Sequence, residues 1–112
     1  MRIAVPVVNG VLSPHFGHCE TFSLIDTNGD GKSIAQVEQV DAPPHEPGLL
    51  PAWLAERGVN CIIAGGMGQR ARGLFDAKDI TVIVGAPTDT PENLAKAYLS
   101  GDLQDGENAC DH

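Results

Sequence analysis

The sequence predicts an α/β domain built on a mixed five-stranded sheet with helices packed on it. The first observation is a run of three β-branched and apolar segments separated by turn residues, which is typical of an antiparallel meander. The second is the alternation of helical and strand patterns after residue 48, which favours parallel strands joined by right-handed crossovers. With 112 residues the chain has room for one modest core, so residues 1–112 are assigned to a single domain.

The three early strands are expected at Arg2–Val8, Thr21–Asp26 and Ser33–Val40. Asn9-Gly10 is a turn signal after the first strand, and residues 11–17 are expected to form a loop. Residues 28–31 include types that tolerate positive φ, so the second and third strands are expected to form a hairpin.

The later elements are a helix at Leu49–Arg57, a strand at Asn60–Ala64, a helix at Met67–Ala77, a strand at Ile80–Val84 and a last helix that begins at Pro91. Gly58 is the expected stop of the first of these helices. Thr90 is the expected N-cap of the last helix, and Pro91 suits its first position because no N–H is needed there. Gly101 ends that helix, and residues 101–112 are assigned to a polar tail.

Composition excludes several classes of function. The formal net charge of -8 disfavours a general nucleic-acid partner, because phosphate binding needs a basic face. No apolar run is long enough to span a bilayer, and the first residues resemble a strand rather than a signal peptide. Three cysteines, an odd number, do not indicate a disulfide framework, so we expect a reduced, cytoplasmic protein.

A glycine-rich turn follows the predicted strand at Asn60–Ala64 and consists of Gly65-Gly66-Met67-Gly68. The first N–H groups of the helix that follows lack partners inside the helix, and they favour an anion together with the helix dipole. Arg70 or Arg72 would offset the charge of that anion. The alternative is a tight turn that only lets the helix and the strand pack. Residues 66–71 also fit the G-x-G-x-x-A form of the dinucleotide fingerprint, which leaves an enzyme acting on a nucleotide as a further alternative.

A second group of candidate residues offers imidazole and thiolate, the ligands favoured by borderline and soft transition metals. Its members are His15, His18 and Cys19 in an early loop and Cys110 and His112 at the C-terminus. Together they predict a zinc site if the two segments meet in space. The alternatives are a solvated loop histidine, a buried Cys19 and a disordered tail. Cys61, inside a predicted buried strand, is expected to be inert.

With these residues in view, the whole chain resembles the NifX/NafY family of dinitrogenase iron–molybdenum cofactor biosynthesis domains. That family includes the C-terminal domain of NifB-type proteins and the small orange proteins that carry a molybdenum–copper cluster. The matching segments are Met1–Pro6, Ser13–Cys19, Leu50–Leu54, Ile63–Gly68 and Cys110–His112.

The resemblance implies a ribonuclease-H-like α/β fold without that fold's catalytic carboxylates. It implies binding of an anionic metal–sulfur cluster or its precursor, held non-covalently or by few ligands. It places His15 at the cluster, beside Phe16 and Gly17. It also implies that the loop of Gly65, Gly66, Met67 and Gly68 lines the pocket.

We therefore expect a binding protein, a carrier or scaffold for a molybdenum-containing metal–sulfur cluster (Mo–Fe–S or Mo–Cu–S), and not an enzyme. Its expected partners are the proteins that donate and accept the cluster, among them an ATPase of iron–sulfur assembly, with no nucleic acid and no membrane. Two alternatives come from other classes. One is a zinc-binding structural module, and the other is an interaction domain that regulates a partner.

Overall fold

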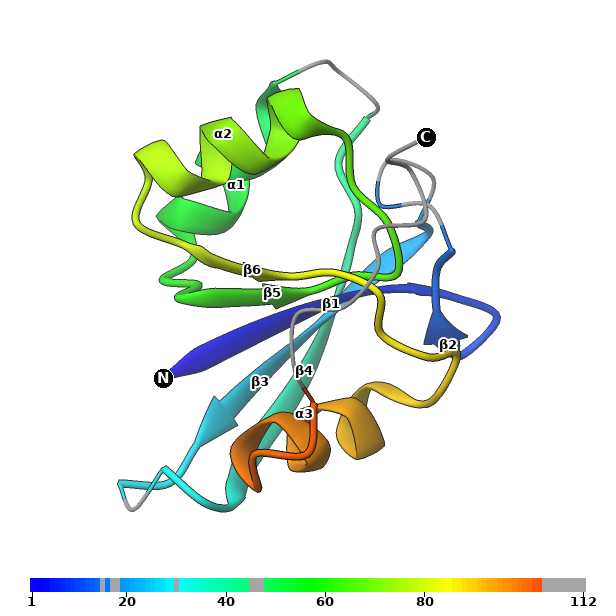
Figure 1. The fold of residues 1–112 in the computed structure, drawn as a ribbon, viewed down its shortest axis with the longest axis vertical. Coiled ribbons are helices and arrows are strands. Elements are labelled where there is room, and N and C mark those ends of the chain that lie inside the picture. Colours follow the sequence, from blue (N-terminus) through cyan, green and yellow to red (C-terminus); the bar gives the residue numbers. More distant parts are fainter. Residues whose placement is uncertain (15, 17–18, 30, 45–47, 104–112) are drawn as a thin grey trace.

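The computed structural model describes residues 1–14, 16, 19–29, 31–44 and 48–103. Within these ranges the chain forms six strands and three helices (Figure 1). The strands are β1 (Arg2–Val8), β2 (Val11–Leu12), β3 (Thr21–Thr27), β4 (Ile34–Asp41), β5 (Cys61–Ile63) and β6 (Thr81–Ile83). The helices are α1 (Leu49–Glu56), α2 (Gln69–Ala77) and α3 (Pro91–Leu99).

The strands form one mixed sheet in the order β4-β3-β1-β5-β6, with β2 paired to β1. The chain from β1 through β3 to β4 is antiparallel, whereas β1, β5 and β6 are parallel to one another. This confirms the predicted meander followed by parallel strands. Since β1, β5 and β6 run in the same direction, their carboxyl ends lie at the same end of the sheet, where α/β proteins usually bind ligands.

The prediction of five strands was wrong by one short strand, β2. Residues 11 and 12 were expected in a loop but pair with β1, Val8 opposite Val11 and Val7 opposite Leu12. Asn9 and Gly10 both adopt positive φ, 54° and 81°, which is the two-residue hairpin turn whose twist matches paired strands. A strand of two residues has no periodicity to detect, so the turn was its only signal. The likeness to ribonuclease H in particular stays a prediction.

Helices cover both faces of the sheet, with α1 and α2 on one side and α3 on the other (Figure 1). Under α1 and α2 the core contains Phe22, Leu24, Leu54, Ile62, Met67 and Phe75. Under α3 it contains Ile3, Val5, Ile25, Ile63, Leu94 and Ala95. Alternate residues of the central strands therefore pack on opposite faces, as expected for strands buried on both sides.

Helix ends follow their local chemistry. Thr90 caps α3 as predicted, because its hydroxyl accepts a hydrogen bond from the Asn93 N–H at 3.3 Å, and Pro91 occupies the first turn. Gly58 follows α1 with φ of 77°. The second helix begins at Gln69, two residues later than predicted, because Gly68 is extended with φ of -67° and ψ of 154°.

None of the described helices is long and apolar enough to cross a membrane. Residues 104–112 of the predicted tail lie outside the described ranges.

Candidate functional site

Three connections meet at the carboxyl ends of the parallel strands. After β2 the chain is held to β1, because the Ser13 N–H donates to the Pro6 carbonyl at 2.9 Å. The connection after β6 joins the one after β5, because the Gly85 N–H donates to the Gly65 carbonyl at 3.0 Å. It also reaches β2, since the Leu12 N–H donates to the carbonyl of Asp89 at 3.0 Å.

The glycine-rich turn lies directly against the early loop. The Phe16 N–H donates to the Gly66 carbonyl at 3.4 Å. A Cβ placed on Gly65 would lie 3.6 Å from the carbonyl oxygens of both Ser13 and Pro14, so this stretch of backbone packs against the turn at van der Waals distance. The structure thus brings together Phe16 and the glycines Gly65 and Gly66, which are fifty residues apart in the sequence.

The two apolar members of the predicted site are buried. Phe16 is 8% exposed, and its ring lies edge-on to Phe75 at 5.4 Å and to Phe22 at 6.3 Å between ring centroids. Met67 is 1% exposed and belongs to the core under α1 and α2. Their side chains therefore fix the two loops to the core. Of the three glycines in the turn, Gly66 is buried, Gly65 is half-buried and Gly68 is exposed.

The first turn of α2 has backbone N–H donors without an acceptor in the part of the chain that the structure describes. The Arg72 N–H donates to the Gly68 carbonyl at 3.1 Å and is the first N–H of α2 bonded within the helix. The N–H groups of residues 69–71 precede it, and no described residue accepts from them. Gly68 supplies no side-chain cap, the first turn contains no acidic residue, and a Cβ on Gly68 would meet nothing within 4 Å. This helix end is open and electropositive, which suits an anion.

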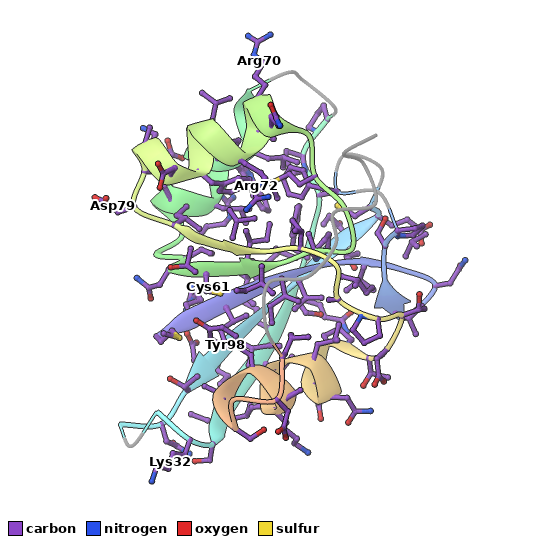
Figure 2. The ribbon with its side chains drawn as sticks, viewed as in Figure 1. Lys32, Cys61, Arg70, Arg72, Asp79 and Tyr98 are labelled. Carbon is purple, nitrogen blue, oxygen red and sulfur yellow. The ribbon has the colours of Figure 1, made fainter. Side chains whose placement is uncertain are left out.

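Arg70 and Arg72 point in different directions (Figure 2). Arg70 is exposed and points away from the body of the molecule at the start of α2. Arg72 is half-buried and points toward the sheet, beside β6. Of the two, Arg70 lies in the first turn of α2 and is the one placed to add positive charge at that helix end.

Two cysteines are described, and both are protonated at neutral pH. Burial raises the pKa of the half-buried Cys19 to about 11. Cys61 in β5 is 1% exposed, as predicted for a residue of a buried strand, and burial raises its pKa to about 11 despite a hydrogen bond with Tyr98 (Figure 2). A thiol in either environment is a weak nucleophile, and it must lose its proton to bind a metal.

Five of the predicted site residues cannot be placed, because they lie outside the described ranges: His15, Gly17, His18, Cys110 and His112. The predicted zinc site is therefore not tested, because four of its ligands lie among these residues: His15, His18, Cys110 and His112. Within the described ranges no three His, Cys, Asp or Glu side chains are grouped to hold a metal ion.

The connection between β6 and α3, residues 84–90, was not predicted to lie at the site. The Asp89 carbonyl accepts from β2, and its carboxylate accepts from the Asn93 side-chain amide of α3 at 3.0 Å and from the Thr90 N–H at 2.7 Å. These hydrogen bonds hold the pKa of Asp89 below its usual value. The predicted parallel pairing was the available signal, because the carboxyl ends of parallel neighbours such as β5 and β6 lie at the same end of the sheet.

Known proteins match the chain over almost its full length. The model of the family described as "Dinitrogenase iron-molybdenum cofactor" matches residues 1–101. Protein MJ0580 of Methanocaldococcus jannaschii is 36% identical over 107 residues, which cover 93% of this chain and 90% of that protein. Among solved structures, PH0822 superposes with a TM-score of 0.84 at 29% identity, covering 99% of this chain and 96% of that one. The apo form of the orange protein from Desulfovibrio gigas shares the fold with a TM-score of 0.73 at 23% identity, covering 96% and 93%.

Proposed function

Because the chain belongs to the dinitrogenase iron–molybdenum cofactor family, we propose that it is a carrier or scaffold for an anionic, molybdenum-containing metal–sulfur cluster. The cluster is cargo, taken from a donor protein and passed to an acceptor. On this proposal the protein performs no bond-making chemistry of its own and works in the cytoplasm. An ATPase of iron–sulfur assembly is the partner we propose first.

One observation supports this proposal more than any other: the contact between the Phe16 N–H and the Gly66 carbonyl. It joins the early loop, which carries His15 next to Phe16 in the sequence, to the turn that opens α2. Had these two segments lain on opposite sides of the molecule, no single cluster would reach both. Their contact is what a shared binding site requires.

The chemistry of the turn suits sulfide-bearing anions. The open N–H groups of the first turn of α2 donate hydrogen bonds to anionic sulfur, and each such charge-assisted bond contributes about 1.5–3 kcal/mol. The helix dipole adds to them, and so does Arg70. Local donors of this kind are needed because the net charge of -8 repels anions from the protein as a whole.

In this proposal His15 donates a hydrogen bond to the cluster or ligates one of its metals. Additional ligands are available only if the early loop and the C-terminus meet in space, and they are then His18, Cys19, Cys110 and His112. The two thiols among them must also lose their protons. Burial raises the pKa of Cys19 to about 11, so this thiol would have to release its proton on binding a metal at neutral pH. The proposal therefore rests on the backbone donors and on His15, for either a Mo–Fe–S or a Mo–Cu–S cluster.

Anaerobic loading tests the proposal. The apoprotein is incubated with tetrathiomolybdate and Cu(I), freed of unbound metal by gel filtration, and examined by visible absorption and by elemental analysis for Mo, Cu and Zn. We expect a coloured protein with bound molybdenum, weakened by His15→Ala and unchanged by Lys96→Ala on α3 across the sheet. Zinc at one equivalent without a visible band, or equal colour in His15→Ala and the unaltered protein, would overturn it.

A further inference from the structure

Among the described residues, strand β6 is an edge of the sheet with no neighbouring strand on its outer side. Its Thr81 N–H donates to the Asn60 carbonyl at 2.9 Å, and its Ile83 carbonyl accepts from the Ala64 N–H at 2.8 Å. Hydrogen-bonding direction alternates along a strand, so the N–H and carbonyl of Val82, between them, point away from the sheet. No described strand pairs with β6 on that side. Exposed edges of this kind are templates for another chain.

The two edges of the sheet differ in chemistry. The other edge strand, β4, carries Glu38 and Asp41, charges of the kind that discourage edge-to-edge pairing. The sequence of β6 is Thr-Val-Ile, which has high strand propensity and no charge or proline. Charge, proline and shortness all discourage edge-to-edge pairing, and of these β6 has only shortness. Of the two edges, β6 is therefore the one suited to pairing.

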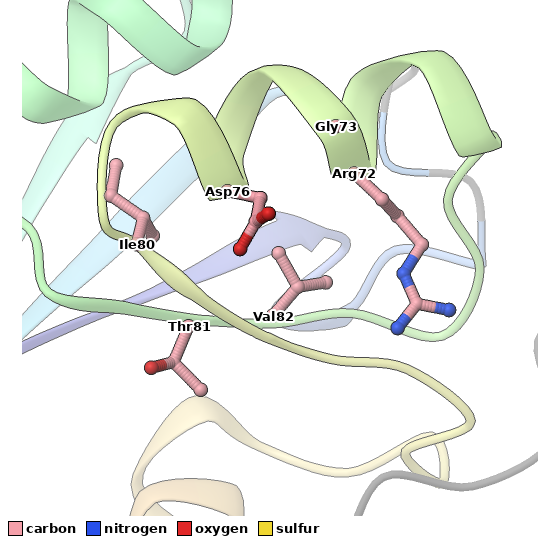
Figure 3. Close-up of a pocket in the computed structure, with 6 residues that line it drawn as sticks. All are labelled: Arg72, Gly73, Asp76, Ile80, Thr81 and Val82. Carbon is pink, nitrogen blue, oxygen red and sulfur yellow. The ribbon is translucent and has the colours of Figure 1, made fainter.

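A hollow of about 450 Å³ lies between this edge and α2. It is lined by Arg72, Gly73, Asp76, Ile80, Thr81 and Val82 (Figure 3). Figure 3 shows the side chains of Arg72 and Asp76 descending from α2 toward β6, on either side of Val82. The open main chain of Val82 is thus flanked by one cation and one carboxylate.

Gly73 sits in the middle of α2 on the side of the hollow. A glycine inside a helix is unfavourable compared with alanine. Nothing inside the molecule requires it, because it is exposed and a Cβ there would meet no atom within 4 Å. A helix backbone without a side chain at such a position lets another backbone approach closely.

We propose that this edge and the adjoining face of α2 bind a second copy of the same chain around a two-fold axis. A two-fold interface must be complementary to itself, and this surface carries both signs of charge on one helix face, four residues apart. With the axis at Val82, the two β6 strands pair antiparallel and exchange the N–H···O bonds of Val82. Each Arg72 then lies toward the partner's Asp76, and the two α2 helices approach at Gly73.

The patch is small, so the dimer is weak and depends on concentration. Sedimentation velocity of the full chain without any cluster, over a concentration series up to about 1 mM, should show reversible dimerisation. Gly73→Ala is the decisive variant. It should raise the melting temperature of the dilute monomer by about 2–6 °C, since alanine favours the helix. It should also weaken the dimer at least about tenfold by filling the contact.

A charge swap tests the predicted pairing. Arg72→Asp places like charges in apposition twice per dimer, so we expect the dissociation constant to rise about tenfold. The double variant Arg72→Asp with Asp76→Arg should return it to within about threefold of the original value. Lys96→Asp on α3, with the same change in net charge, should leave it unaltered. A protein that stays monomeric throughout, or a dimer equally strong in Gly73→Ala, would refute the proposal.

Discussion

Gly68→Asp is the substitution that tests the anion site of α2 most directly. Gly68 is the N-cap, with the extended backbone that capping residues adopt, and its side-chain position is open. An aspartate there would accept a hydrogen bond from an N–H of the first turn and place a negative charge at the positive end of the helix dipole. In the variant, the new carboxylate therefore occupies the place of the anionic cluster and competes with it.

The size of the effect follows from its two components. A capping side chain in place of glycine contributes a few tenths of a kcal/mol, and the charge contributes about 0.3–1 kcal/mol. We expect the free energy of unfolding to rise by about 0.5–1.5 kcal/mol. For a cluster, the loss of even one charge-assisted bond of about 1.5–3 kcal/mol weakens binding by a factor of about 10–150.

The assay combines urea unfolding of the apoprotein with titration of tetrathiomolybdate under anaerobic conditions. Gly68→Asn is the matched control, because asparagine caps the helix with nearly the same shape and no charge. It should give the smaller gain in stability and the smaller loss of affinity. If Gly68→Asp stabilises the apoprotein but binds the thiomolybdate as tightly as the unaltered protein does, the cluster does not occupy this helix end, and the proposed geometry is wrong.

Two further predictions concern groups whose pKa the fold changes. Arg2 donates to both carboxylate oxygens of Asp26, from Nε at 2.8 Å and from Nη2 at 3.1 Å, and this contact lowers the pKa of Asp26. Asp26→Asn should reduce the free energy of unfolding by about 0.5–1 kcal/mol at pH 7, and in urea unfolding the difference should disappear as the pH falls from about 4 through the lowered pKa of the folded state. In a Cys110→Ser background at pH 8, the raised pKa of Cys19 leaves about 100-fold less thiolate than an ordinary cysteine has, so iodoacetamide should label the native protein far more slowly than the urea-unfolded protein. Equal labelling rates in the two states would show that the Cys19 thiol is not shielded.

The sequence was sufficient for the features that depend on neighbouring residues. The cap at Thr90 and Pro91 was predicted because capping involves side chains within three residues of the helix start. The hairpin between β3 and β4 and the strand–turn–helix around Gly65 were predicted because their turn residues lie next to the elements that they connect. The strand β2 was missed, although Asn9-Gly10 signalled its turn, because two residues form no pattern.

The site depended on contacts that no spacing encodes. Phe16 meets Gly66 because β1 and β5 are neighbours in the sheet, a consequence of strand order rather than of either loop's sequence. A methionine at a turn suits either a ligand or the core, and core packing was the favoured use of Met67, which its burial confirms. Residues two apart in a helix lie on different faces, so the different directions of Arg70 and Arg72 were expected. Which of them adds charge at the helix end became clear only with the start of α2 at Gln69.

The burial of Met67 has a consequence for how quickly the glycine turn can bind a ligand. Its side chain anchors the middle of the glycine turn in the interior, so the flanking amides keep their orientation in the empty protein. A ligand that binds a receptor already in shape loses little chain entropy on arrival. If the protein takes a cluster from a donor protein as proposed, uptake at this turn should be governed by the encounter of the two proteins rather than by a slow rearrangement of the recipient.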